Sequence, residues 1–259
     1  MLGAIIGDIV GSRFEFNNHL STDFDLFTPE CDFTDDTICT IAVADALLKD
    51  IPFAESLRYW CRKYPHPKGS YGGSFFCWLS SENPQPYNSF GNGSAMRVSP
   101  CAWLSNDMET VLSTAMLSVA CTHNHPEGVK GALCVAECIF RGRFFHGKHS
   151  IKQLVEDRYG YTLNATCTEI RKNKSFNETC QVTVPQAIIC FLESDDFESA
   201  IRLAVSIGGD SDTIAAITGS IAEAYYSIPE NIKTKALGYL PQDMLDVYSA
   251  FNNRLLAKE

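Results

Sequence analysis

Two short acidic clusters lie near opposite ends of the 259-residue sequence, and each precedes an apolar run of helical character. The clusters are Thr34-Asp35-Asp36-Thr37 and Gly208-Gly209-Asp210-Ser211-Asp212-Thr213. Carboxylates packed this closely repel one another unless a cation neutralises them. Carboxylate and hydroxyl oxygens are hard ligands that suit Mg²⁺ or Mn²⁺ rather than Zn²⁺. If the clusters meet in space, they predict a site for two divalent metal ions.

Each cluster also has a simpler interpretation, because Asp and Thr are favoured residues at the start of a helix. One carboxylate is enough for a helix cap, whereas Asp35 and Asp36 are adjacent and have Thr on both sides. In the second cluster, two glycines permit a tight turn, after which Asp210 and Asp212 can point to one place. The two clusters together therefore favour a metal site over two separate caps.

Two glycine loops between the clusters are candidates for ligand binding. In the loop at 70–74, Tyr71 can stack on a base or a ribose. The loop at 89–97 would expose backbone N–H groups to a diphosphate. Plain turns are the alternative interpretation of both loops. The residues to which we assign a binding role are Tyr71, Gly72, Gly91, Asn92, Gly93 and Ser94.

Two further residues depend on their surroundings for a role. His123 lies three residues before Pro126, at the start of a long helical run. An oxygen-rich metal site argues against imidazole ligands, so we expect His123 to hydrogen-bond a ligand, with a structural role as the alternative. Glu15 lies between two phenylalanines, and this local pattern alone assigns it no function.

Composition and charge narrow the class of protein. Hydrophobic residues make up 45% and charged residues 20%, which is typical of a soluble globular protein. The net charge of −10 argues against broad nucleic-acid binding, which relies on positive charge. No apolar run is long enough to span a membrane, and the first residues lack the basic start of a signal peptide. Eleven scattered cysteines without a C-x-x-C pair predict free thiols in a cytoplasmic protein.

Helical periodicity dominates the sequence, so we expect one compact all-α domain over residues 1–259 and, by default, a monomer. The segment 17–33 is polar, acidic and aromatic, and is expected to be a loop. The expected helices are 4–16, 35–49, 53–64, 111–120, 126–145, 200–207, 214–228 and 241–257.

Two of these helices are preceded by possible capping boxes. Asn106 with Glu109, and Asp195 with Glu198, have the three-residue spacing of this motif. Strand signals are weak. Residues 160–183, rich in Thr, Asn and Lys, are expected to hold short extended pieces or a mobile loop.

In order and approximate spacing, these motifs resemble those of the ADP-ribosylglycohydrolase family. The matching residues are Gly3, Ala4, Gly7, Asp8 and Gly11 with Glu15, the two acidic clusters, Tyr71, Gly72, the segment 91–97, His123 and Pro126. The resemblance implies an all-α fold with two Mg²⁺ (or Mn²⁺) ions. It implies as their ligands Thr34, Asp35, Asp36, Asp210, Asp212 and Thr213.

The resemblance also implies a function. The metals would hold ribose hydroxyls, the glycine loops would hold a diphosphate, and Glu15 would lie on a flap near the scissile bond. The expected reaction is hydrolysis of the glycosidic bond between ADP-ribose and a modified protein side chain or nucleic acid, through an oxocarbenium-like transition state. Glu15 or Asp36 would act as acid or base.

Two alternatives stay open at this point. The first is a non-catalytic protein that binds ADP-ribose or an NAD metabolite on the same fold. The second is an all-α, Mg²⁺-dependent diphosphate enzyme such as a terpene synthase. Those enzymes use an Asp-Asp-x-x-Asp motif, which Cys39 breaks in this sequence.

Overall fold

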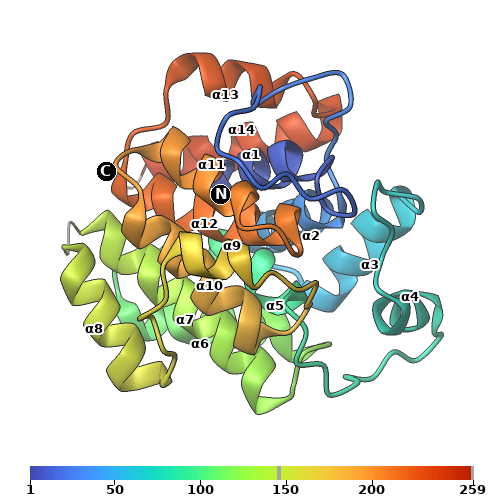
Figure 1. Ribbon diagram of the computed structural model, residues 1–259. Coiled ribbons are helices and arrows are strands. Elements are labelled where there is room, and N and C mark those ends of the chain that lie inside the picture. The colour runs from blue at the N-terminus through green and yellow to red at the C-terminus, as the bar shows by residue number, and fades with distance from the viewer. Residues whose placement is uncertain (145–146, 258–259) are drawn as a thin grey trace.

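The computed structural model describes residues 1–144 and 147–257, which fold into helices joined by loops (Figure 1). Within these residues there are fourteen α-helices and one short 3₁₀ helix. Extended pairing there is limited to two isolated bridges, Thr34 with Lys68 and Gly91 with Thr179. The prediction of an all-α fold is confirmed.

In chain order, the helices are α1 (Leu2–Gly11), α2 (Asp35–Lys49), α3 (Phe53–Lys63), α4 (Gly73–Ser80), α5 (Gly93–Met96), η1 (Ser99–Ala102), α6 (Met108–Ala120), α7 (Pro126–Arg143), α8 (Lys148–Tyr159), α9 (Cys167–Lys172), α10 (Cys180–Glu193), α11 (Phe197–Ser206), α12 (Ser211–Tyr225), α13 (Glu230–Leu237) and α14 (Gln242–Leu256).

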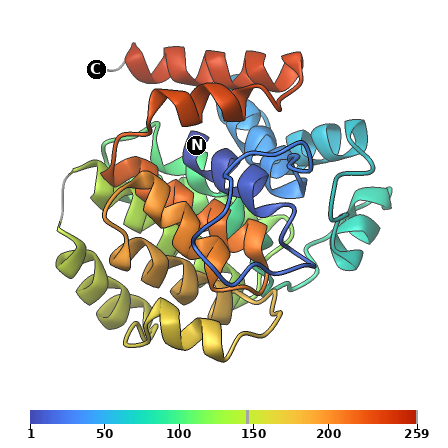
Figure 2. The same cartoon turned by 45° about the horizontal axis from the view of Figure 1, so that its top comes forward.

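Helix α12 is at the centre of the packing and contacts α1, α7, α10 and α11. Figures 1 and 2 show α13 and α14 at the top of the molecule, α4 at its right edge and α8 at its lower left. One hydrophobic core runs through these layers, and it includes Ile5 and Ile9 of α1, Ile38 of α2 and Ile217 of α12, all fully buried. Burial of these apolar faces, rather than helix propensity alone, stabilises the helices.

Helices α1 and α12 approach closely because glycines of α1 face the backbone of α12. A Cβ atom at Gly7 would lie 2.0 Å from the carbonyl oxygen of Ala215, and one at Gly11 would lie 2.5 Å from Cα of Asp212. Any larger residue would force the two helices apart. The two helices are antiparallel, since Gly7 faces Ala215 and Gly11 faces Asp212. The end of α1 therefore lies beside the start of α12, where the second acidic cluster is found.

Several predicted helix boundaries were wrong. Helix α1 ends at Gly11 rather than at residue 16, and the chain continues through a turn in which the N–H of Phe14 donates to the carbonyl oxygen of Gly11 at 2.8 Å. Helix α7 ends at Arg143, and the predicted end at residue 145 lies outside the described residues. The segment 160–183 is partly helical, since it contains α9 and the start of α10; the stretches between are irregular, and Thr179 forms the isolated bridge with Gly91.

The predicted caps were displaced by one residue. Asp107, not Asn106, caps α6 by accepting a hydrogen bond from the N–H of Thr110 at 2.8 Å. Asp196 caps α11 and forms the capping box with Ser199. In both cases an Asp next to the predicted residue has the side chain that reaches the free N–H three positions later.

Two sequence expectations concern the whole chain. All eleven cysteines are free thiols, as predicted. None of the helices in the described ranges has the length and apolar character that crossing a membrane requires.

Candidate active site

The first acidic cluster is fixed by a buried carboxylate that the sequence analysis did not assign to the site. Asp8 of α1 accepts hydrogen bonds from the backbone N–H and hydroxyl of Thr34, at 2.9 and 2.7 Å. It also accepts them from the N–H of Thr37, at 3.1 Å, and from its hydroxyl. Thr34 in turn accepts from the N–H of Asp36 and so caps α2. Asp8 therefore ties the start of α2 to α1.

The second acidic cluster is held by an amide from the glycine loop at 89–97. Gly208 and Gly209 both have positive φ angles, +74° and +80°, which turn the chain sharply into α12. Asn92 donates from Nδ2 to Oδ2 of Asp210 at 2.6 Å, and to the hydroxyl of Thr183 at 3.1 Å. Asn92 was predicted to contact a diphosphate; its side chain orients a carboxylate.

A second amide joins the Glu15 loop to the same turn. Asn18 donates from Nδ2 to the carbonyl oxygens of Gly209 and Phe14, both at 2.8 Å, and of Glu15 at 3.2 Å. Its Oδ1 accepts from the N–H of Gly209 at 3.0 Å. Asn18 therefore fixes the backbone before and at Glu15 relative to the second cluster.

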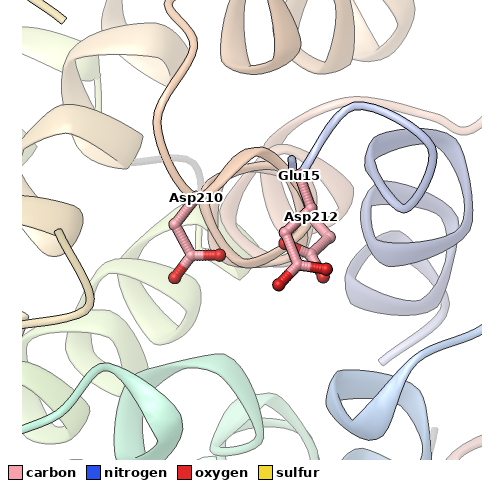
Figure 3. Close-up of side chains that lie close together, drawn as sticks. All are labelled: Glu15, Asp210 and Asp212. Atoms are coloured by element: carbon pink, nitrogen blue, oxygen red, sulfur yellow. The ribbon is translucent and has the colours of Figure 1, made fainter. Parts of the chain in front are cut away.

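These supports bring the two clusters to one cavity of about 250 Å³. Glu15, Asp210 and Asp212 each offer a carboxylate oxygen, and these oxygens lie within 4.8 Å of one another (Figure 3). The hydroxyl of Thr213 donates to Oδ2 of Asp36 at 3.3 Å and so bridges the clusters. The cavity is also lined by Asp35.

In the described part of the chain, two carboxylate oxygens of these clusters are buried without a partner. Oδ1 of Asp36 and Oδ1 of Asp212 are buried and have no hydrogen-bond partner within the described residues. Burial first, and the neighbouring carboxylates second, raise the pKa of both side chains well above its ordinary value. The same causes raise the pKa of Glu15 to about 8. Buried oxygens that lack partners and repel one another fit a divalent cation.

The sequence profile of ADP-ribosylglycohydrolases matches residues 1–258. The protein belongs to the ADP-ribosylglycohydrolase family.

Relatives in this family cover most of the chain. ADP-ribosylhydrolase ARH3 of Homo sapiens is 27% identical over an alignment of 327 positions, gaps included, which covers 95% of this chain and 90% of the relative. The ADP-ribosyl-[dinitrogen reductase] glycohydrolase of Rhodospirillum rubrum is 25% identical over 255 residues, covering 88% and 85% of the two chains. A solved ADP-ribosylglycohydrolase-related protein complex contains a chain with TM-score 0.72 and 23% identity, covering 98% of this chain and 97% of that one. This last similarity confirms the fold.

Within this family member, most of the binding residues predicted from the sequence line the cavity. They are Gly72, Gly91, Asn92, Gly93 and His123. Three predicted site residues are instead engaged outside it. The hydroxyl of Thr34 donates to Asp8, that of Tyr71 donates to the carbonyl oxygen of Tyr64 at 2.7 Å, and that of Ser94 donates to the carbonyl oxygen of Gly128 at 2.7 Å.

Other lining residues were given no role by the sequence analysis. They are Cys39, Ser70, Gly73, Ser74, Phe75, Tyr87, Ser89, Met96, Arg97 and Glu178. Arg97 is the last residue of the segment 91–97, which resembles the family motif. That resemblance is the one sequence signal that could have indicated a place for Arg97 in the site. Glu178 lies in the segment that was expected to be extended or mobile, so local pattern could not reveal its position.

Proposed function

We propose that this protein is a metal-dependent hydrolase that cleaves the glycosidic bond between ADP-ribose and a modified acceptor. Membership of the ADP-ribosylglycohydrolase family supports this reaction class. The observation that carries the proposal is the meeting of both acidic clusters at one cavity, with unpartnered oxygens on Asp36 and Asp212.

The donor set suits two Mg²⁺ or Mn²⁺ ions, because all its members are hard oxygen ligands. Asp35, Asp36, Asp210, Asp212 and Thr213 would hold these ions from the cavity wall. Thr34 would bind an ion only through a lone pair of its hydroxyl oxygen, because its hydroxyl group already donates a hydrogen bond to Asp8. When bound, such ions orient hydroxyl groups and increase the acidity of water.

Proton transfer is assigned to Glu15, with Asp36 as the alternative. Glu15 is half-buried at the cavity wall, and its pKa is raised to about 8 by burial and by nearby carboxylates. Bound cations would offset the repulsion of the nearby carboxylates and lower this pKa toward neutrality, where a carboxyl group can both give and take a proton. Breaking the bond to the ribose builds positive charge on the sugar, which the surrounding carboxylates stabilise.

The rest of the ligand would extend along the glycine loop. The N–H groups of Gly91 and Asn92 are already bonded, to the hydroxyl of Ser89 at 3.1 Å and to the carbonyl oxygen of Glu178 at 2.7 Å. The diphosphate would therefore meet Gly93 and His123 rather than these two N–H groups.

A substrate panel tests the proposal. The protein is incubated with proteins ADP-ribosylated on arginine or serine and with ADP-ribosylated nucleic acid, with Mg²⁺ or with a chelator. We expect free ADP-ribose from at least one substrate, and loss of that activity with the chelator or in Asp212→Asn. Binding of ADP-ribose without release from any substrate, while metal is bound, would support a non-catalytic binder and contradict hydrolysis.

Two properties of the whole molecule are also proposed. The free thiols support a reducing, cytoplasmic compartment. We propose a monomer, which light scattering of the purified protein measures directly.

A further inference from the structure

Three buried polar side chains form a hydrogen-bonded chain that ends at the cavity. An NH₂ group of Arg97 donates to the hydroxyl oxygen of Thr122 at 2.7 Å. That oxygen lies 2.8 Å from Nδ1 of His123. The three residues are 1%, 0% and 4% exposed, so water does not compete for these bonds.

The direction of each bond follows from the chemistry of the groups. A guanidinium group can only donate, so Oγ1 of Thr122 must accept from Arg97. The hydroxyl proton of Thr122 then has two acceptors nearby: Nδ1 of His123 at 2.8 Å and the carbonyl oxygen of Val119 at 3.4 Å. The carbonyl oxygen of Val119 already accepts from the backbone N–H groups of Thr122 and His123, at 3.1 and 2.8 Å, so the hydroxyl of Thr122 donates to Nδ1. A ring nitrogen that accepts carries no proton.

The charge state of His123 agrees with this direction. A protonated ring would place positive charge beside the buried guanidinium of Arg97. Burial, and then the charge of Arg97, lower the pKa of His123 well below its ordinary value. The ring is therefore neutral at neutral pH, and its one proton resides on Nε2.

Nε2 faces the cavity beside the glycine loop. A Cβ atom added to Gly93 would lie 3.2 Å from Nε2, and one added to Gly91 would lie 3.7 Å from it. The imidazole lines the cavity, and no group in the described part of the chain accepts a hydrogen bond from Nε2. This N–H is available to a ligand.

We propose that Arg97 and Thr122 are positioning residues that hold His123 as a neutral hydrogen-bond donor, with Nε2–H directed at an oxygen atom of the bound ligand. A phosphate or hydroxyl oxygen has the matching chemistry. The arrangement gives His123 no role as a general base. The identity of the ligand rests on the proposed function, whereas the position of the proton does not.

The position of the proton is measured by ¹⁵N NMR on the whole protein with labelled histidine. The chain has six histidines, and His123→Gln identifies the signal that belongs to this ring. We expect a protonated Nε2 and an unprotonated Nδ1, unchanged between about pH 6 and 8. A proton on Nδ1, or a ring that becomes an imidazolium in this range, would overturn the inference.

The positioning role is measured by calorimetric binding of ADP-ribose in the presence of Mg²⁺. Thr122→Val removes the donor to Nδ1 and should weaken binding about tenfold, whereas Thr122→Ser keeps the hydroxyl and should restore it. The matched control is Thr218→Val, another fully buried threonine, whose hydroxyl donates to the carbonyl oxygen of Ala187 at 3.0 Å. It should lower stability and leave ADP-ribose affinity unchanged.

The two measurements test the positioning role and the proposed function separately. Equal ADP-ribose affinity of Thr122→Val and the unaltered protein would contradict the positioning role. If the unaltered protein binds no ADP-ribose, the proposed function fails, and the NMR measurement still decides whether Arg97 and Thr122 place the proton.

Discussion

The two acidic clusters carry similar residues, but the molecule supports them in different ways. The first is fixed by one carboxylate, Asp8, which receives four hydrogen bonds between two core helices. The second is fixed by two amides, Asn92 and Asn18, which reach it from loops. The first cluster is thus part of the folded core, whereas the second is adjusted by loop residues that also border the cavity. Loss of the support of the first cluster should affect folding, and loss of the support of the second should affect the site.

The largest expected effect is on stability and comes from Asp8→Ala. The substitution leaves four buried donors of Thr34 and Thr37 without a partner, so we expect a loss of about 3–5 kcal/mol in the free energy of unfolding. Urea unfolding followed by circular dichroism measures it. Asp107→Ala, which removes the exposed cap of α6, is the control and should cost about 1 kcal/mol. Similar losses in the two variants would contradict a special role for Asp8.

The next effect is on metal binding and comes from Asn92→Ala. Without the donor to Asp210 this carboxylate loses its orientation, and such partners typically contribute about 10–100-fold in metal affinity. Calorimetric titration with Mn²⁺ measures the change, and stability should fall by only about 1–2 kcal/mol. Asn83→Ala, at an exposed position outside the cavity, should change neither quantity. Unchanged Mn²⁺ affinity together with a large loss of stability would remove the contrast between the clusters.

A smaller effect is expected from Asn18→Ala. The Glu15 loop loses its attachment to the turn at Gly209, so we expect kcat to fall about tenfold while Mn²⁺ affinity stays within about threefold. The neighbouring Asn17→Ala is the matched control, because Asn17 is exposed and its side chain bonds no group in the described ranges. Steady-state kinetics separate kcat from KM. Equal behaviour of the two variants would show that Asn18 does not position Glu15.

The smallest expected effect is on the pH dependence of the thermal stability of the metal-free protein. The pKa of Glu15 is raised from 4.5 to about 8, so the folded state holds this proton more tightly than the unfolded chain does. The stability that this proton contributes is complete below about pH 4.5 and is lost as the pH rises through about 8. We expect the Tm in a chelator to fall across this range, Mg²⁺ to restore it, and Glu15→Gln to flatten the decline.

Thermal unfolding at a series of pH values checks this prediction. A metal-free Tm that rises between about pH 4.5 and 8 would contradict it. Asp8, which supports the first cluster, should respond in a lower pH range, because its pKa is raised only to about 6, by burial that its hydrogen bonds partly offset.

The sequence revealed the helices and the acidic clusters because both are local patterns. Helical periodicity marks α2 and α12, and the paired carboxylates precede each of them. The supports were not visible, because they join residues far apart: Asp8 to Thr34 across 26 positions, Asn92 to Asp210 across 118, and Asn18 to Gly209 across 191.

Local patterns were also incomplete in places. The segment 160–183 has few apolar residues at helical spacing, yet Thr166 and Glu169 form a capping box that begins α9. Asn92 lies in a glycine loop that suits a diphosphate, and only the fold shows its amide at Asp210. Tyr71 has the side chain of a stacking residue, but burial directs its hydroxyl into the core.

The central claim is that the two clusters form one metal site, and a double-mutant cycle on Mn²⁺ affinity tests it most directly. Asp36→Asn, Asp212→Asn and the double variant are titrated with Mn²⁺, and circular dichroism confirms that each retains its helices. We predict that each single variant loses Mn²⁺ affinity. The double variant should lose much less than the sum of the two losses, since both residues bind the same ions. Additive losses, or two independent Mn²⁺ sites each removed by one substitution, would contradict the account.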